Sequence, residues 1–289
     1  MKITKAVIPA AGLGTRVLPA SKAIPKEMLP IVDKPAIQYI VEEAVAAGIT
    51  DILIITGRGK GAIEDHFDRA PELEERLLKS GKTALYDTCI QSAGLANIQY
   101  VRQKETKGLG HAVLCAKSFV GDDPFVVLYG DDVILGESSA TAELCAVYAQ
   151  TGRCVLGVKE VPLSEMYKYG SIRFSYDDAQ NMIVSDMNEK PRPGEALSSY
   201  AILGRVVLTP EIFPVLEQTE PGAGGEIQLT DAMKVLAHRD RMAAKAYSGT
   251  RYDMGNKLGI IEATLAAGLA REDLKDDLKA LLTGLVAKF

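Results

Sequence analysis

The segment KAVIPAAGLGTRVLPASKAIPKEMLPI, residues 5–31, joins a short apolar run to a glycine-containing loop and two cations. The run KAVIP has the continuous apolar centre of a strand that is buried on both faces. Gly12 and Gly14 let backbone N–H groups approach an anion, because they carry no Cβ atom. Arg16 adds a planar fork of donors, and the prolines on either side of Lys26 lower the cost of positioning its ammonium group. The segment therefore predicts a strand that leads directly into a polyphosphate site.

A dinucleotide-binding fingerprint is the alternative interpretation of this loop. Gly12-Leu-Gly14 follows a strand, but Val17 stands where the third glycine would be. A second glycine cluster, Gly57–Gly61, also follows an apolar run, and it lacks both the full spacing and the acidic partner. We interpret this cluster as a tight turn between a strand and a helix.

Apolar strands and helical patterns alternate along the first half of the chain. Strands are predicted at 51–56, 98–101, 124–129 and 154–158, and helices at 36–47, 109–118 and 138–150. The long connection 57–96 contains ELEERLLKS and is expected to be a helical insertion. This alternation is typical of an α/β fold with a mixed, mostly parallel sheet that is covered by helices.

The pattern changes from about Tyr167. Two short apolar runs flank a polar turn and predict a β-hairpin, and four helices are expected after a further strand. The hairpin strands are 171–175 and 182–185, the further strand begins at Tyr200, and the helices are 210–217, 226–237, 256–269 and 272–286. Without a Pro/Ser linker or a repeat, residues 1–289 are expected to form one domain. We divide it into a nucleotide-binding part (about 1–160), a substrate-side part (about 161–250) and C-terminal helices (about 256–289).

The composition of the chain argues against several classes of function. The 289 residues are 47% hydrophobic and 25% charged, as in an ordinary globular protein. A net charge of −5 argues against nonspecific nucleic-acid binding. No uncharged apolar run approaches the ~18 residues of a membrane span, and the start does not resemble a signal peptide. Four cysteines without a CxxC pair and three isolated histidines predict a cytoplasmic protein without a zinc site.

Several linked motifs in one order resemble the signature of the sugar-nucleotide pyrophosphorylases. They are AVIPAAGLGTRVLPASKAIPKEMLPIVDKPAIQYIVEEA, QKETKGLGHAVLCAK, GDD, YGSI, NEKP, GGEIQLTDA and RYDMGNKLG. The similarity is greatest to bacterial UTP–glucose-1-phosphate uridylyltransferases, and it runs over nearly the whole chain. The resemblance implies a Rossmann-like nucleotidyltransferase fold and the conversion of UTP and glucose 1-phosphate to UDP-glucose and pyrophosphate.

The resemblance assigns a residue set to the nucleotide and the metal. The nucleotide set is Ala10, Ala11, Gly12, Gly14, Thr15, Arg16, Lys26, Gln103, Gly108 and Asp131. Asp131 follows a predicted parallel strand, and its hard carboxylate suits Mg²⁺. Asp132 is the alternative ligand, Asp253 resembles a second metal-facing aspartate, and the number of Mg²⁺ ions stays open. By resemblance Gln103 reads the uracil edge, which thymine shares, so thymidylyl transfer remains an alternative.

A second set belongs to the sugar and to the chemistry. By resemblance Gly170, Glu189, Lys190 and Gly204 bind the sugar phosphate, and Arg16, Lys26, Asp131 and Lys190 are catalytic. Asn188 departs from the valine expected beside this motif. The segment 224–231 is interpreted as a helix start with Glu226 in its first turn.

No general base is required, because a phosphate monoester has a second pKa of ~6 and is already mostly dianionic at neutral pH. A third alternative is a catalytically weak paralogue that binds sugar nucleotide and regulates a partner. The family suggests a homo-oligomer, a dimer or tetramer, built partly through the C-terminal helices, whose leucine stripe is otherwise interpreted as core.

Overall fold

A nine-stranded sheet runs through the molecule in the order β5-β4-β1-β6-β11-β8-β12-β10-β9. The computed structural model describes residues 2–289, apart from the side chain of Ala223; Met1, where the predicted domain begins, lies outside the described residues. The strands of this sheet are β1 (Lys5–Pro9), β4 (Asp51–Thr56), β5 (Asn97–Arg102), β6 (Phe125–Leu128), β8 (Cys154–Glu160), β9 (Gly170–Tyr176), β10 (Met182–Glu189), β11 (Tyr200–Leu208) and β12 (Met242–Ala246). Two small antiparallel sheets pair β2 (Pro30–Ile31) with β3 (Lys34–Pro35) and β7 (Asp132–Leu135) with β13 (Thr250–Asp253).

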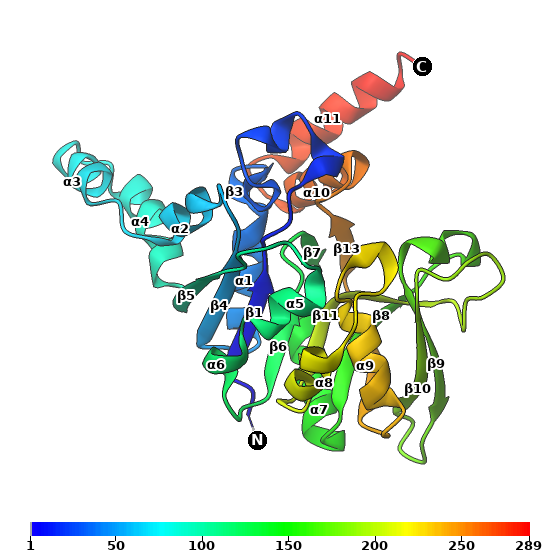
Figure 1. Cartoon of the computed structure of the whole chain (residues 1–289). Helices are drawn as coiled ribbons and strands as arrows, with labels where there is room; N and C mark the ends of the chain where they lie inside the picture. The colour runs from blue at the N-terminus through cyan, green and yellow to red at the C-terminus, as the bar shows by residue number, and fades with distance from the viewer. Residues whose placement is uncertain (1) are drawn as a thin grey trace.

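Helices cover both faces of the sheet (Figure 1). They are α1 (Ala36–Ala46), α2 (Gly61–Phe67), α3 (Pro71–Lys79), α4 (Thr83–Gln91), α5 (Leu109–Leu114), α6 (Lys117–Val120), α7 (Ala140–Thr151), α8 (Ile212–Gln218), α9 (Leu229–Ala237), α10 (Lys257–Ala270) and α11 (Lys275–Val286). Buried residues of α1, α7 and α10 form one hydrophobic core, and those of α5, α8 and α9 form the other. Strand β1 contributes Ile8 to the first core and Val7 to the second, as the two-residue period of a strand requires. The α/β fold class predicted from the sequence is confirmed.

The parallel pairing is confined to part of the sheet. Strands β5, β4, β1 and β6 pair in parallel, as do β8 and β12. Strand β11 lies between β6 and β8 and is antiparallel to both. The sequence predicted only the start of β11, so it did not indicate that residues 205–208 would pair with β6. The predicted hairpin is confirmed as the antiparallel pair β9–β10.

Several predicted boundaries were wrong. The helix expected over 109–118 is divided into α5 and α6, with a break at Cys115 and Ala116. Helix α9 begins at Leu229, so Glu226 lies before the helix and not in its first turn. Strands β7, β12 and β13 were not predicted. Two of them have only four residues, and β12 (MAAKA) is rich in alanine, which carries a weak strand signal.

Two helical segments project from the body of the molecule (Figure 1). The predicted insertion forms α2, α3 and α4, and its outer helices α3 and α4 make an arm. Helix α11 extends to the upper right in Figure 1, away from the α3–α4 arm at the left. None of its described residues is buried. The structure therefore does not support a core role for the leucine stripe of α11.

A buried ion pair ties α1 to the centre of the sheet. Arg205 of β11 is 0% exposed, and its Nη2 lies 2.5 Å from Oε2 of Glu43. The backbone N–H of Thr141 and its hydroxyl also donate to Oε1 of Glu43, at 3.0 and 2.7 Å. Burial alone would raise the pKa of Glu43, but Arg205 and Thr141 outweigh it and lower that pKa below its ordinary value. Glu43 is therefore held as a carboxylate inside the protein.

Exchange of Glu43 for glutamine is expected to lower the free energy of unfolding by about 3–5 kcal/mol, because it leaves the Arg205 guanidinium buried without a counter-charge. Urea denaturation at neutral pH measures the loss. The difference between wild type and variant should shrink as the pH falls below 4.5, since a carboxylate with a lowered folded-state pKa stabilises above its ordinary pKa and loses that contribution on protonation.

The matched control is Glu42→Gln, one residue away on α1. Glu42 lies 2.7 Å from Lys34, and both side chains are partly exposed. This exchange is expected to cost about 1 kcal/mol or less. Equal losses for the two variants would contradict the importance assigned to the buried pair.

Candidate active site

The glycine-containing loop leaves β1 at the carboxyl edge of the parallel strands. Its first N–H, from Ala10, donates to the carbonyl of Ile55 on β4 at 2.8 Å. Gly14 has φ +69°, a conformation that favours glycine, and its carbonyl accepts a 2.6 Å hydrogen bond from the Ser21 hydroxyl. A Cβ on Gly12 would lie 3.8 Å from Nζ of Lys26, so the loop borders this ammonium group closely.

Two cations and two carboxylates meet above the loop. Nζ of Lys26 lies 2.5 Å from Oδ2 of Asp131, which follows β6. Arg16 bridges the aspartates, with Nη2 3.6 Å from Oδ2 of Asp131 and Nη1 3.2 Å from Oδ2 of Asp253. The backbone also joins them, because the N–H of Met254 donates to the Asp131 carbonyl at 2.8 Å. Residues far apart in the sequence are thus brought together as predicted.

The charges in this group support one another. Burial alone would lower the pKa of Lys26, but the charges of Asp131 and Glu27 outweigh it and raise that pKa. Burial alone would raise the pKa of Asp131, but Lys26 and Arg16 lower it overall. These shifts keep Lys26 as an ammonium and Asp131 as a carboxylate at neutral pH.

Asp131 and Asp253 are the carboxylates that could hold a metal ion. Among residues 2–289 no cluster of three or more Asp, Glu, His or Cys side chains could hold an ion alone. A metal here would therefore take most of its oxygen ligands from phosphates and water, as Mg²⁺ commonly does. Hard oxygen donors that already attract Lys26 and Arg16 fit such an ion.

Asp132, the alternative metal ligand, has a different partner. Its Oδ1 accepts a hydrogen bond from Nη2 of Arg251 on β13. Burial raises the pKa of Asp132 to about 6, with Asp131 adding to the rise and Arg251 opposing it. Arg251 was not predicted as a site residue. Its position two residues before Asp253 on one strand could have indicated it, because alternate residues of a strand share a face.

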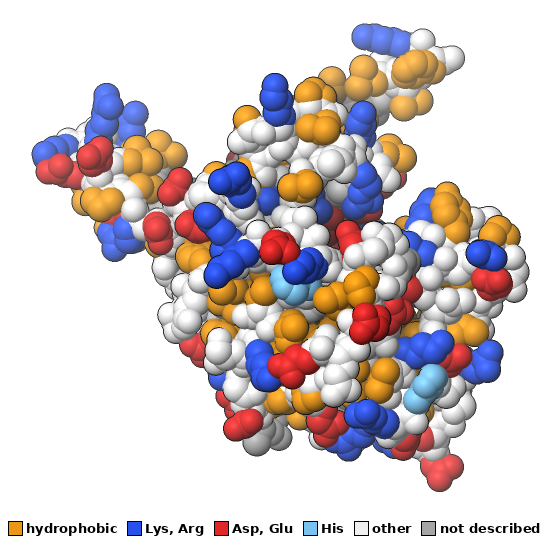
Figure 2. All heavy atoms as spheres, viewed as in Figure 1, with side chains coloured by type: hydrophobic (Ala, Val, Ile, Leu, Met, Phe, Trp, Pro, Cys, Tyr) orange, Lys and Arg blue, Asp and Glu red, His pale blue; other side chains and the backbone are white. Residues whose placement is uncertain are grey.

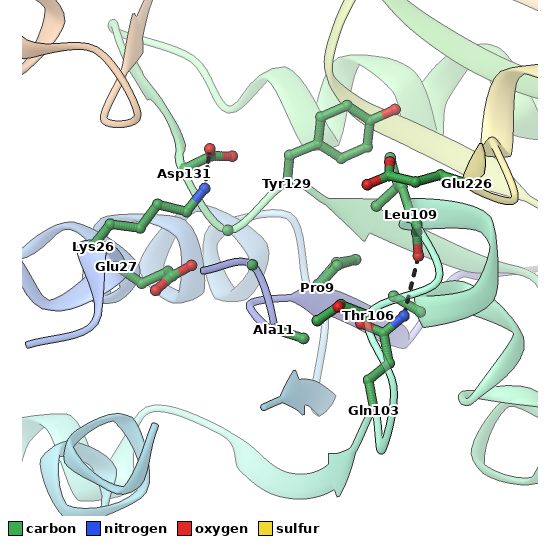
Figure 3. Close-up of a pocket in the computed structure, with 14 residues that line it drawn as sticks. Pro9, Ala11, Lys26, Glu27, Gln103, Thr106, Leu109, Tyr129, Asp131 and Glu226 are labelled. Atoms are coloured by element: carbon green, nitrogen blue, oxygen red, sulfur yellow. Dashed lines mark hydrogen bonds and ion pairs between the residues drawn. The ribbon is translucent and has the colours of Figure 1, made fainter. Parts of the chain in front are cut away.

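Gln103 lies at the other end of a hollow lined by 14 residues, including Gly12, Lys26 and Asp131 (Figure 3). The backbone N–H of Gln103 donates to the Thr56 carbonyl of β4 at 2.9 Å. Its side-chain amide nitrogen lies 3.1 Å from the Gly108 carbonyl and 2.9 Å from Nδ1 of His111. Because Gln103 is only 6% exposed, its amide is fixed at the wall of the hollow.

Gly108 and the segment before α9 close this hollow. Gly108 has φ +98°, and a Cβ there would lie 2.7 Å from both Cβ of Glu226 and the carbonyl oxygen of Ile227. The backbone of Ile227 pairs with the loop through Lys107 and Gly110, at 2.8 Å each. Glu226 consequently borders both the hollow and the wider cleft beside it, a placement that the sequence did not indicate.

Three of the four residues predicted for the sugar lie on β9, on β10 or directly after β10. Oε2 of Glu189 accepts a 2.8 Å hydrogen bond from the Thr230 hydroxyl, and a Cβ on Gly170 would lie 3.1 Å from the same oxygen. Lys190 has φ +45°, and its Nζ lies 4.0 Å from Oε1 of Glu189. Gly204 lies apart from them, in the irregular part of β11, where a Cβ would approach Oδ2 of Asp132 to 3.3 Å.

The hollow beside Gln103, the charged group around Lys26 and Asp131, and the region around Gly170 and Glu189 form one continuous cleft. The hollow that contains Gln103 shares Lys26, Tyr129 and Asp131 with a wider cleft of about 1060 Å³. That cleft shares Tyr129 and Glu189 with the pocket beside Gly170. Its cationic and anionic groups gather midway between the two ends. A group of cations and carboxylates in a cleft at the carboxyl ends of parallel strands is typical of an α/β enzyme of the nucleotide-dependent transferase class.

Comparison with known proteins identifies the family. The nucleotidyl transferase family profile matches residues 5–268. A UTP–glucose-1-phosphate uridylyltransferase of Bacillus subtilis (strain 168) is 53% identical over 287 residues, which cover 99% of this chain and 98% of that protein. The chain therefore belongs to the nucleotidyl transferase family, within the group of the UTP–glucose-1-phosphate uridylyltransferases.

Solved structures agree with this assignment. A UTP-bound UDP-glucose pyrophosphorylase from Acinetobacter baumannii is 40% identical, with a TM-score of 0.90 over 97% of this chain and 99% of that chain. A UDP-glucose pyrophosphorylase complexed with UDP-glucose is 43% identical, with a TM-score of 0.83 over 93% of this chain and 100% of that chain. Over the part of the chain that the structure describes, no helix is long and apolar enough to cross a membrane.

Proposed function

We infer that this protein makes UDP-glucose and pyrophosphate from UTP and glucose 1-phosphate. The meeting of Lys26, Arg16, Asp131 and Asp253 midway along the cleft is the observation that carries this conclusion. An oxygen of the sugar phosphate bonds to the α-phosphorus of UTP, and the bond from that phosphorus to the pyrophosphate oxygen breaks. Family membership and the 53% identity to an enzyme of that name support this reaction.

The residues overcome the repulsion between a dianion and a polyanion. The amides of residues 12–14, Arg16 and Lys26 hold the phosphates of UTP, and Lys190 holds the phosphate of glucose 1-phosphate. Asp131 and Asp253 would hold Mg²⁺, which would supply further positive charge to the phosphate oxygens. Since the attacking phosphate is already ionised at neutral pH, these residues align the reactants and do not remove a proton.

The ends of the cleft select the substrates. Gln103 reads the pyrimidine edge, and Gly108 completes the wall of the base hollow. Glu189 accepts from sugar hydroxyls, and Gly170 lets the chain approach the ring. Gly204 was predicted to bind the sugar, but it is not among the residues that line the cleft or the pocket beside Gly170. Because a Cβ at this position would lie 3.3 Å from Oδ2 of Asp132, we propose instead that Gly204 leaves room for the Asp132 side chain.

A panel of nucleoside triphosphates against sugar 1-phosphates, with pyrophosphate release as the readout, tests this function. UTP with glucose 1-phosphate is expected to give the highest turnover, and EDTA should abolish it. A clear preference for dTTP would replace the uridylyl assignment by thymidylyl transfer. Binding of UDP-glucose without turnover for any pair would favour the regulatory alternative.

The oligomeric state and the cytoplasmic location stay predictions. We propose a dimer or tetramer that covers α11, whose exposed side chains include Leu281 and Val286. Figure 2 shows hydrophobic side chains at the surface of this projecting helix. Sedimentation analysis of the full chain measures the state directly.

A further inference from the structure

The glycine cluster Gly57–Gly61 lies beneath the nucleotide hollow, although it does not have the pattern of a phosphate loop. The strand before it, β4, supports the site from two sides, because Ile55 accepts from Ala10 and Thr56 accepts from Gln103. A Cβ on Gly57 would lie 3.0 Å from the carbonyl oxygen of Ala11. The end of β4 therefore holds both the glycine-containing loop and the base-reading residue.

Lys60 makes the third connection. It precedes α2, and its side chain points into the protein, where Nζ lies 2.7 Å from Oε2 of Glu27. Lys60 is 6% exposed and Glu27 is 1% exposed, so the ion pair is almost entirely removed from water. Charges are buried in this way only with a partner, and each therefore restricts where the other can lie.

Glu27 joins this pair to the phosphate-binding cation. Lys26 and Glu27 belong to the same short 3₁₀ turn, Lys26–Met28, and both border the hollow (Figure 3). The neighbouring side chain, Lys26, points to Asp131 from this turn. A shift of the turn would move the Lys26 ammonium group away from the phosphates and open the wall of the hollow.

We propose that Lys60 is a positioning residue for nucleotide binding, which fixes the Lys26–Met28 turn through its buried ion pair with Glu27. The proposal rests on the proposed function, from which it takes UTP as the nucleotide. It does not depend on which sugar phosphate the protein uses. Lys60 itself lines neither the hollow nor the wider cleft. It acts on the UTP end of the cleft, because Gly170, Glu189 and Lys190, which are assigned to glucose 1-phosphate, do not line the hollow that contains Gln103.

A purely structural role is the competing explanation, and kinetics separate the two. Lys60→Met is expected to raise the KM for UTP and its dissociation constant about tenfold. The KM for glucose 1-phosphate should stay within about twofold, because no residue of the Lys26–Met28 turn lines the pocket beside Gly170. Calorimetric titration with UTP in the presence of Mg²⁺ gives the dissociation constant without turnover.

Lys34→Met is the matched control. Lys34 also lies 2.7 Å from a glutamate, Glu42, but it does not line the cleft. This variant is expected to leave both KM values within about twofold of the wild type. The control removes a lysine–glutamate pair of equal length without disturbing the nucleotide site.

The double variant Lys60→Met/Glu27→Gln keeps the test decisive if the single variant folds poorly. It leaves no ionised group unpaired at this position, and the unanchored turn should still weaken UTP binding about tenfold. A wild-type UTP dissociation constant in either folded variant would overturn the proposal, as would equal rises in both KM values. Failure of the wild type to release pyrophosphate would instead contradict the proposed function and leave the UTP titration as the test of Lys60.

Discussion

Exchange of Asp131 for asparagine is expected to lower kcat by about 10²–10³-fold. Asp131 is the one aspartate that contacts both Lys26 and Arg16 in the described structure, at 2.5 and 3.6 Å. Asparagine has nearly the same shape and lacks the charge, so it cannot fix these cations or attract a divalent ion to the same extent. Steady-state turnover measured over a range of Mg²⁺ concentrations should show both a lower maximum and a higher Mg²⁺ requirement.

Asp123→Asn is the control for this experiment. Asp123 precedes the first residue of β6, whereas Asp131 follows the last residue of that strand. The Asp123 side chain is exposed and pairs with Lys5 at 2.8 Å. Its exchange should change kcat by no more than about twofold. Normal turnover of the Asp131 variant at low Mg²⁺ would show that Asp131 does not hold the metal ion.

Exchange of Lys190 for alanine is expected to reduce kcat/KM for glucose 1-phosphate by about a hundredfold, because it removes the cation assigned to the sugar phosphate. Binding of UTP should be nearly unchanged, since Lys190 lies beside Glu189 at the other end of the cleft. Kinetics with each substrate varied in turn measure the asymmetry. An equal loss for both substrates would contradict the role assigned to Lys190.

Arg192→Ala provides the matched control for Lys190. Arg192 is an exposed cation two residues further along the same loop, and it borders a separate surface pocket beside Tyr167. Its removal lowers the local positive charge without removing a group from the cleft. We expect kcat/KM for both substrates to stay within about twofold of the wild type.

The sequence was most informative where local chemistry and long-range contacts agree. Lys5–Pro9, with its apolar centre, was predicted as a strand and is confirmed as β1. The loop after it was predicted to share a polyphosphate site with Arg16 and Lys26, and Gly12 lies beside Lys26. The position of Asp131 after a buried strand placed it at the carboxyl edge of the sheet, where ligands of α/β proteins bind.

Other features depend on contacts that no local pattern encodes. Lys60 was interpreted only as part of a tight turn, because its buried partner Glu27 lies 33 residues earlier in the chain. Arg251 depends on the pairing of β7 with β13, two strands too short to be predicted. The antiparallel insertion of β11 between β6 and β8 follows from the whole sheet and not from the residues of β11 alone.

The most direct test is a crystal structure of this chain with UDP-glucose and Mg²⁺ bound. The diphosphate is expected to lie between the amides of the glycine-containing loop and Nζ of Lys190, with the metal ion close to Asp131. The uracil should face Gln103 and the glucose should face Glu189. A diphosphate bound away from Gly14, Asp131 and Lys190 would contradict the claim that these fixed charges bring the two phosphates together.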